Sequence, residues 1–164
     1  MTTHRSATLV HAGGMRFVAT TGTKRTMVYG DEAPTGELSP VETIVVSLAA
    51  CSAMDVISIA TKKRQRIKSY RVHVEASQRD EYPQILTRVD VVHEVEGPLV
   101  DEAAIRRAIE LSATKYCPVN AMLSAGATEV HHGYRIRHTG VEPFEAEGEV
   151  VVTGPYRRPE IVPA

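Results

Sequence analysis

The chain has 164 residues, of which 43% are apolar and 24% are charged, and its formal net charge is -1. This length and composition are typical of one globular domain that buries its own core, and they argue against a mainly disordered chain. The balanced charge gives no general electrostatic footprint for nucleic acid or an anionic membrane, and Trp, a common base-stacking platform, is absent. We therefore expect neither nucleic acid nor a membrane among the partners.

The two cysteines, Cys51 and Cys117, are too few for a disulfide scaffold, and they do not form the CxxC pair of a zinc ribbon. The sequence opens without the charged and apolar segments of a secretory signal, so we expect a cytoplasmic protein. In that reducing compartment two cysteines are more often free or redox-active than permanently bridged.

Three short strands are predicted in the first 30 residues. Segments 7–10 and 16–20 are separated by Gly13-Gly14, which is typical of a hairpin turn. Residues 26–29 predict a third strand, and the Gly- and Pro-containing segment 30–38 predicts a loop.

A long helix is predicted over residues 41–61. Ser39 caps its first turn, Pro40 suits its first position, and Glu42 completes an S-x-x-E capping box. The apolar residues do not keep to one stripe, so we expect a helix that is buried nearly all round in a soluble domain. A membrane span is the competing interpretation, which the carboxylate of Asp55 within the segment disfavours.

Alternating polar and apolar residues predict the strands that follow. Segments 70–76 and 85–95 predict an antiparallel hairpin, and residues 101–116 predict an amphipathic helix. Residues 118–123 predict a short helix that opens on a proline, and residues 129–138 predict one more strand. This order indicates an α+β fold with antiparallel strands and a buried long helix.

The C-terminal segment, residues 139–164, contains four prolines. We expect it to be an extended or partly disordered extension of a domain that spans residues 1–138, although residues 150–153 could add an edge strand.

Cys51 lies midway along the predicted long helix, where a small core residue is the simplest interpretation. Asp55 follows one turn later on the same face, and its carboxylate disfavours a thiolate at Cys51 unless a cation lies nearby. Glu42 precedes Cys51 by nine residues. This spacing places the two on opposite helix faces, roughly 13 Å apart along the axis. A site that uses both needs an intermediary or a second chain.

Cys117 is the more activated cysteine by local rules alone. It precedes Pro118 at a helix N-terminus, where the helix dipole favours an anion, and Lys115 is close in sequence. A cysteine that occupies the cap position by chance explains the same pattern equally well.

The histidines predict no metal site. His131 and His132 are adjacent on a predicted strand, so their side chains point to opposite faces. Zinc needs three or four convergent ligands, and the sequence offers neither that set nor a Gly-rich phosphate loop. We therefore expect no metal and no cofactor.

Two motifs carry a resemblance to a known family. The segments SPVETIVVSLAACSAMD (39–55) and KYCPV (115–119) resemble the OsmC/Ohr family of osmotically inducible and organic hydroperoxide resistance proteins. The CSAMD continuation is more similar to the OsmC-like branch. The resemblance implies antiparallel sheets wrapped around two long central helices in an intertwined homodimer, with thiol peroxidase sites at the dimer interface.

The resemblance also implies roles for individual residues. Cys51 resembles the peroxidatic cysteine, Cys117 the resolving cysteine, and Glu42 the glutamate that orients a catalytic arginine. Arg16, beside the Gly13-Gly14 turn, is our choice for that arginine, and Arg25 is the alternative.

The implied activity is reduction of organic hydroperoxides through a Cys51–Cys117 disulfide that a dithiol reductant resets. One alternative is a non-catalytic dimer that binds a small apolar ligand and keeps its cysteines as packing or as a slow redox switch. A more remote alternative is another thiol-dependent enzyme on the same scaffold.

Overall fold

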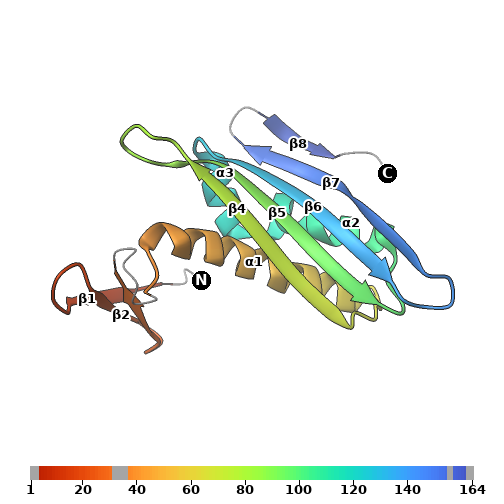
Figure 1. Ribbon diagram of the computed structural model, residues 1–164, viewed down its shortest axis with the longest axis horizontal. Helices are drawn as coiled ribbons and strands as arrows, with labels where there is room; N and C mark the ends of the chain where they lie inside the picture. The colour runs from red at the N-terminus through yellow and green to blue at the C-terminus, as the bar shows by residue number, and fades with distance from the viewer. Residues whose placement is uncertain (1–3, 31–36, 155–156, 162–164) are drawn as a thin grey trace. The chain divides into compact units, whose positions relative to one another are not determined.

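The computed structural model describes residues 4–30, 37–154 and 157–161. The chain divides into two units, Met1–Ile44 and Val45–Ala164. Helix α1 (Pro40–Lys62) begins in the first unit and continues into the second (Figure 1).

The first unit contains an antiparallel sheet with the strand order β1-β2-β3. Strands β1 (Ala7–His11) and β2 (Phe17–Thr21) form a hairpin whose turn holds Gly13 and Gly14 at φ of 96° and 58°. These angles lie in the left-handed region that glycine adopts without strain. Strand β3 (Thr26–Tyr29) completes the sheet, so all three predicted strands are confirmed.

The predicted start of α1 is also confirmed. The backbone N–H of Ser39 donates to Glu42 Oε2 at 2.7 Å, and the N–H of Glu42 donates to Ser39 Oγ at 3.2 Å. These two bonds are the capping box. Hydrogen bonds from the backbone N–H and the side chain of Ser39 to the Glu42 carboxylate lower the pKa of Glu42. Most of the loop predicted over residues 30–38 lies outside the described residues.

The second unit is built on a five-stranded sheet with the order β4-β5-β6-β7-β8. Neighbouring strands are antiparallel except β5 and β6, which are parallel. The expectation of antiparallel strands throughout is therefore wrong at this pair, because a helical connection returns the chain in the same direction. The strands are β4 (Ser69–Gln78), β5 (Leu86–Gly97), β6 (Glu129–His138), β7 (Phe144–Gly154) and β8 (Arg157–Ile161).

The connection between β5 and β6 consists of α2 (Glu102–Leu111), the π-helical turn η1 (Ser112–Tyr116) and α3 (Pro118–Ala125). Figure 1 shows α2 and α3 behind the sheet. Val56 and Ala60 of α1 join Ile105 and Ile109 of α2 in one fully buried cluster against the sheet. The predicted α+β class is confirmed, with the core between one sheet face and these helices.

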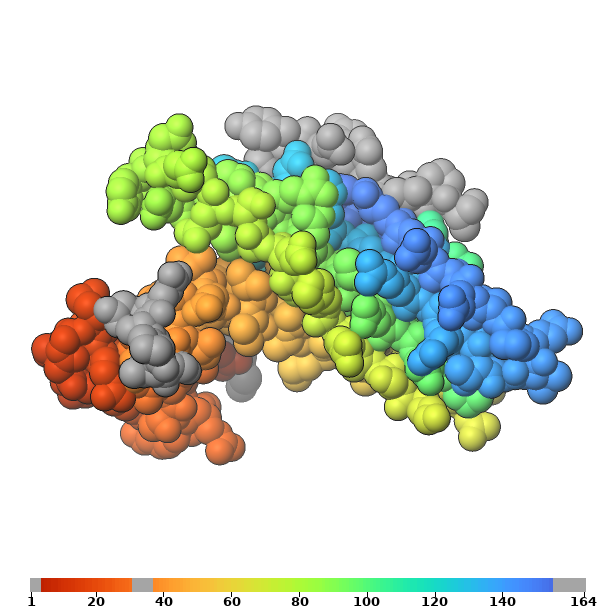
Figure 2. All heavy atoms as spheres, viewed as in Figure 1, coloured from red at the N-terminus to blue at the C-terminus, as the bar shows by residue number. Residues whose placement is uncertain are grey.

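The opposite face of the sheet is charged. In Figure 2 this face is turned toward the viewer, and the side chains of β4 to β7 cover it. Glu94 lies within ion-pair distance of Arg71 and Arg135, and Arg137 pairs with Glu96. Apolar and polar residues therefore alternate along these strands between the core face and the charged face, as the sequence pattern predicts.

Within the described chain α1 is buried along one row rather than nearly all round. Leu48, Ser52, Val56 and Ala60 are each 0% exposed, whereas Met54 is 74% exposed. The four buried residues are one turn apart, so a single stripe faces the second unit. The sheet and its helices cover only this side of α1. By length and hydropathy alone, α1 could also cross a membrane.

The chain beyond residue 138 forms strands rather than a partly disordered extension; the strand allowed at residues 150–153 is confirmed, but within the sheet rather than at its edge. Strand β7 pairs with β6 along its length, and its residues 150–153 are buried. Strand β8 then pairs with β7. The prolines do not interrupt β7, since Pro143 immediately precedes it, and Pro159 falls on the strand at the end of the sheet order.

Candidate active site

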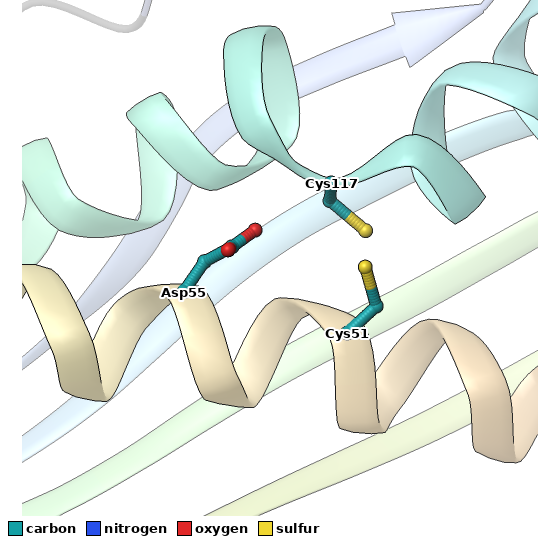
Figure 3. A group of neighbouring side chains, drawn as sticks. All are labelled: Cys51, Asp55 and Cys117. Carbon is teal, nitrogen blue, oxygen red and sulfur yellow. The ribbon is translucent and has the colours of Figure 1, made fainter. Parts of the chain in front are cut away.

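Cys51 and Cys117 face one another between α1 and the segment that leads into α3 (Figure 3). Cys51 is half-buried in the middle of α1, and Cys117 is 3% exposed. The two Sγ atoms and a carboxylate oxygen of Asp55 all lie within 4.8 Å of one another. A disulfide bond is about 2.05 Å long, so the two thiols need only a short approach to close one.

A π-helical turn delivers Cys117 to this position. Helix α2 ends at Leu111, and the backbone N–H of Cys117 donates to the carbonyl of Ser112 at 2.9 Å, five residues back. The helix predicted over residues 101–116 is confirmed in extent, but its last five residues form a π turn rather than an α-helical one. π turns are often found at functional sites, where the wider turn redirects the chain.

Cys117 also caps α3, because its Sγ accepts the backbone N–H of Asn120 at 3.3 Å. Burial raises the pKa of the Cys117 thiol to about 12, a hydrogen bond to Cys51 adds to the rise, and the Asn120 N–H opposes it. Cys117 is therefore a thiol at neutral pH. The local cues that favoured its activation are outweighed by burial, and Lys115 lies over the ring of Tyr116.

Asp55 lies one turn after Cys51, on the same face of α1 as predicted. Its Oδ2 accepts the hydroxyl of Ser112 at 3.0 Å. Ser112 is 0% exposed, and the hydrogen bond fixes the carboxylate beside the two sulfurs. Sequence reasoning missed Ser112, which sits inside an ordinary amphipathic pattern.

A line of buried polar groups continues from Ser112 into the sheet. Its Oγ lies 3.4 Å from Ser52 Oγ, which in turn lies 3.3 Å from Nε2 of His93. Nδ1 of His93 is 2.7 Å from the hydroxyl of Tyr70. The signal that could have found His93 is its place between Val91 and Val95 on the buried face of β5.

A second buried imidazole stacks on the first. The rings of His93 and His132 are 5.9 Å apart, and Nε2 of His132 is 3.0 Å from Oδ1 of Asn120. Burial, together with a nearby histidine in each case, lowers the pKa of His93 to about 3 and that of His132 to about 4. The predicted opposite orientation of His131 and His132 is confirmed, because only His132 is fully buried.

The remaining predicted site residues belong to the first unit. Arg16 Nε donates to Glu37 Oε1 at 2.5 Å, and Glu42 is held in the capping box. The backbone N–H of Arg25 donates to Thr21 Oγ1. Glu42 and Cys51 lie on one continuous helix, so their nine-residue spacing keeps them on opposite faces. The catalytic roles of these three residues stay predictions.

Cysteine sulfurs and carboxylate oxygens both bind zinc, and this cluster brings together two cysteines and one aspartate. Structural zinc sites use four protein ligands, one more than the cluster offers. The expected lack of a metal stays a prediction.

The chain is similar in sequence to a known protein family. The sequence profile described as OsmC-like protein matches residues 30–132. Protein YhfA of Escherichia coli K12 is 37% identical over 107 residues, which are 65% of this chain and 76% of YhfA.

Solved structures share the fold. A hypothetical protein from Aquifex aeolicus VF5 has a TM-score of 0.76 at 25% identity, over 84% of this chain and 99% of that one. The OsmC-like protein from Mycoplasma pneumoniae has a TM-score of 0.73 at 17% identity, over 84% and 100%. An organic hydroperoxide resistance protein from Elizabethkingia anophelis has a TM-score of 0.61 at 13% identity, over 85% and 99%.

Proposed function

The chain belongs to the OsmC-like protein family, and on this basis we propose that it is a cysteine-dependent peroxidase that reduces organic hydroperoxides. The observation that supports this proposal most directly is the pair of facing thiols, Cys51 and Cys117, in a chain with no other cysteine. A structural neighbour is named as an organic hydroperoxide resistance protein, which agrees with the proposed substrate class.

The proposed reaction has three steps. The thiolate of Cys51 attacks one peroxide oxygen, the O–O bond breaks, and the alcohol leaves, so that Cys51 becomes a sulfenic acid. The sulfur of Cys117 then attacks Cys51 Sγ, and water leaves as the disulfide forms. A dithiol reductant returns both thiols by exchange and is itself oxidised to a disulfide.

The unequal burial of the cysteines supports this order of roles. Cys51 is half-buried and can meet a substrate, whereas Cys117 is 3% exposed with a pKa raised by burial. A buried thiol is a poor first nucleophile and a suitable second one, because it meets only a sulfenic acid formed beside it.

Stabilisation of the Cys51 thiolate requires a cation that offsets Asp55. We assign this role to Arg16, with Arg25 as the alternative and Glu42 as the residue that orients it.

The functional form in this proposal is a cytoplasmic homodimer. Along α1, Val46, Met54 and Ile57 expose 53%, 74% and 36% of their surface in the single chain. A second copy that covers these apolar side chains would remove them from water, which favours a dimer.

The same exposed apolar residues favour a second candidate, a non-catalytic dimer that binds a small apolar ligand. The two functions differ in one observable. A peroxidase consumes hydroperoxide in the presence of a dithiol and depends on Cys51, whereas a binding protein does not consume it.

The test is consumption of cumene hydroperoxide with dithiothreitol, dihydrolipoamide or a thioredoxin system. Cys51→Ser abolishes turnover, whereas Cys117→Ser consumes one equivalent and carries a dimedone adduct on Cys51. Ser77→Ala, an exposed change on β4, is the matched control and turns over normally. Undiminished first turnover in Cys51→Ser with an adduct on Cys117 would reverse the roles, and an inert wild type favours the binding protein.

A further inference from the structure

The second step of the proposed reaction meets an obstacle at Cys117. Its thiol is 3% exposed and has a pKa raised to about 12. At neutral pH almost all of a thiol with so high a pKa stays protonated. Cys117 therefore needs a nearby group that removes its proton as it attacks.

Asp55 is a proton acceptor at the right place. Its carboxylate oxygen lies within 4.8 Å of both sulfurs, and Figure 3 shows its side chain directed from α1 toward the segment that carries Cys117. Ser112 donates to one oxygen, Oδ2. A carboxylate has about four lone-pair sites, so this single bond leaves capacity for a proton.

Ser112 holds the base and the thiol together. Its hydroxyl binds Asp55 at 3.0 Å, and its carbonyl accepts the N–H of Cys117 at 2.9 Å across the π turn. An ordinary α-helical turn would pair that carbonyl with the N–H four residues on, not five. The π geometry thus links Ser112, which binds the carboxylate, to the cysteine beside it.

Ser112 is itself held in place by a line of buried polar residues. Ser52 and His93 are 0% exposed and connect Ser112 through hydrogen-bonding distances to Tyr70. Buried polar groups cost stability unless each is paired, so this line fixes the orientation of Ser112 at one end and is anchored in the sheet at the other.

We propose that Asp55 is the general base of the resolving step. Its carboxylate takes the thiol proton of Cys117, the Cys117 sulfur forms a bond to Cys51 Sγ, and the S–O bond of the sulfenic acid breaks. The departing hydroxide takes the proton back from Asp55 and leaves as water. The Cys117 sulfur is oxidised and the Cys51 sulfur is reduced, so the step needs no further reactant. Ser112 is a positioning residue for this base.

The inference rests on the proposed peroxidase function, and the experiment separates the two steps. Reduced protein is mixed with one equivalent of cumene hydroperoxide, peroxide loss is followed at early times, and closure of the disulfide is followed by quenched-flow mass spectrometry. A parallel series uses diamide, whose adduct on Cys51 is displaced by the same attack of Cys117.

Asp55→Asn keeps the size of the side chain and its bond from Ser112 but cannot take a proton. We expect disulfide closure to slow by about 100-fold, which is the lower end of the rate enhancement that a positioned general base supplies. The sulfenic acid on Cys51 then persists long enough for dimedone to trap it. Peroxide loss is not slowed, because removal of a negative charge beside Cys51 favours its thiolate. A solvent deuterium isotope effect on closure is present in the wild type and lost in Asp55→Asn.

Ser112→Ala is expected to slow closure by less than Asp55→Asn does, and Ser112→Thr, which retains the hydroxyl, restores it. If Asp55→Asn closes its disulfide at a rate within about threefold of the wild-type rate, with either cumene hydroperoxide or diamide, Asp55 is not the general base. A wild type that closes its disulfide with diamide but does not consume peroxide overturns the peroxidase and leaves the base assignment supported by the diamide series.

Discussion

His93 and His132 are neutral imidazoles stacked inside the second unit, with pKa values lowered to about 3 and about 4 from 6.5. On unfolding, each ring meets water and recovers a pKa near 6.5. Between pH 6.5 and 4 the unfolded chain therefore binds more protons than the folded chain, so stability falls as the pH falls.

We predict that the free energy of unfolding decreases on acidification below about pH 6.5, by about 1.4 kcal/mol per pH unit for each proton taken up. His132→Gln reduces this slope, and His73→Gln, on the exposed side of β4, does not. Urea unfolding at several pH values between 7.5 and 5 measures both. Equal slopes in all three proteins would show that the buried histidines do not control acid stability.

The chemistry of single residues was only partly predictable from the sequence. The spacing of Cys51 and Asp55 placed both on one helix face because helical periodicity is local. The state of Cys117 was not predictable, since its thiol is kept neutral by burial among elements distant in sequence. Ser112 and His93 were missed for the same reason: their partners come from other elements.

Strand β7 shows how a non-local contact defines an element. Its apolar run at residues 150–152 is too short to decide between an edge strand and an extended tail, and nearby prolines favoured the tail. Pairing with β6 settles the matter, because it satisfies the backbone of both strands and buries Val151 completely. The capping box of α1 and the Gly13-Gly14 turn were predictable because both depend on neighbours in sequence.

We predict that truncation after His138 abolishes cooperative folding. The deletion removes the partner of β6, uncovers Val130 and Ile136, and leaves an open sheet edge that is prone to aggregate. Truncation after Gly154, which keeps β7 and removes β8, is the control and retains a cooperative transition. Thermal unfolding followed by circular dichroism compares the two. A cooperative transition in the shorter protein would restore residues 1–138 as the complete domain.

At the scale of the molecule, α1 has more apolar surface than one chain covers. Met54 and Val46 expose 74% and 53% of their surface, and the helix is long and apolar enough for a membrane span by composition. A second chain and a bilayer are two environments that would cover it. The charged residue Asp55, hydrogen-bonded within the second unit, favours the second chain.

We predict an obligate homodimer that stays in solution without detergent. Sedimentation at low micromolar concentration should give about twice the chain mass of 17.9 kDa. Met54→Lys, which places a charge on the exposed stripe of α1, should shift the protein toward monomer or prevent folding, whereas Ser77→Ala should not. A folded wild-type monomer, or protein found only in membranes, would contradict the predicted assembly.

In the proposed function, Cys51 and Cys117 of one chain form a redox pair that a hydroperoxide oxidises. The measurement is intact-mass and non-reducing peptide mass spectrometry of the reduced protein after one equivalent of cumene hydroperoxide. We predict a loss of two hydrogens and a single cross-linked peptide pair that joins Cys51 to Cys117 within one chain. Two untouched thiols, or bridges found only between chains, would contradict it.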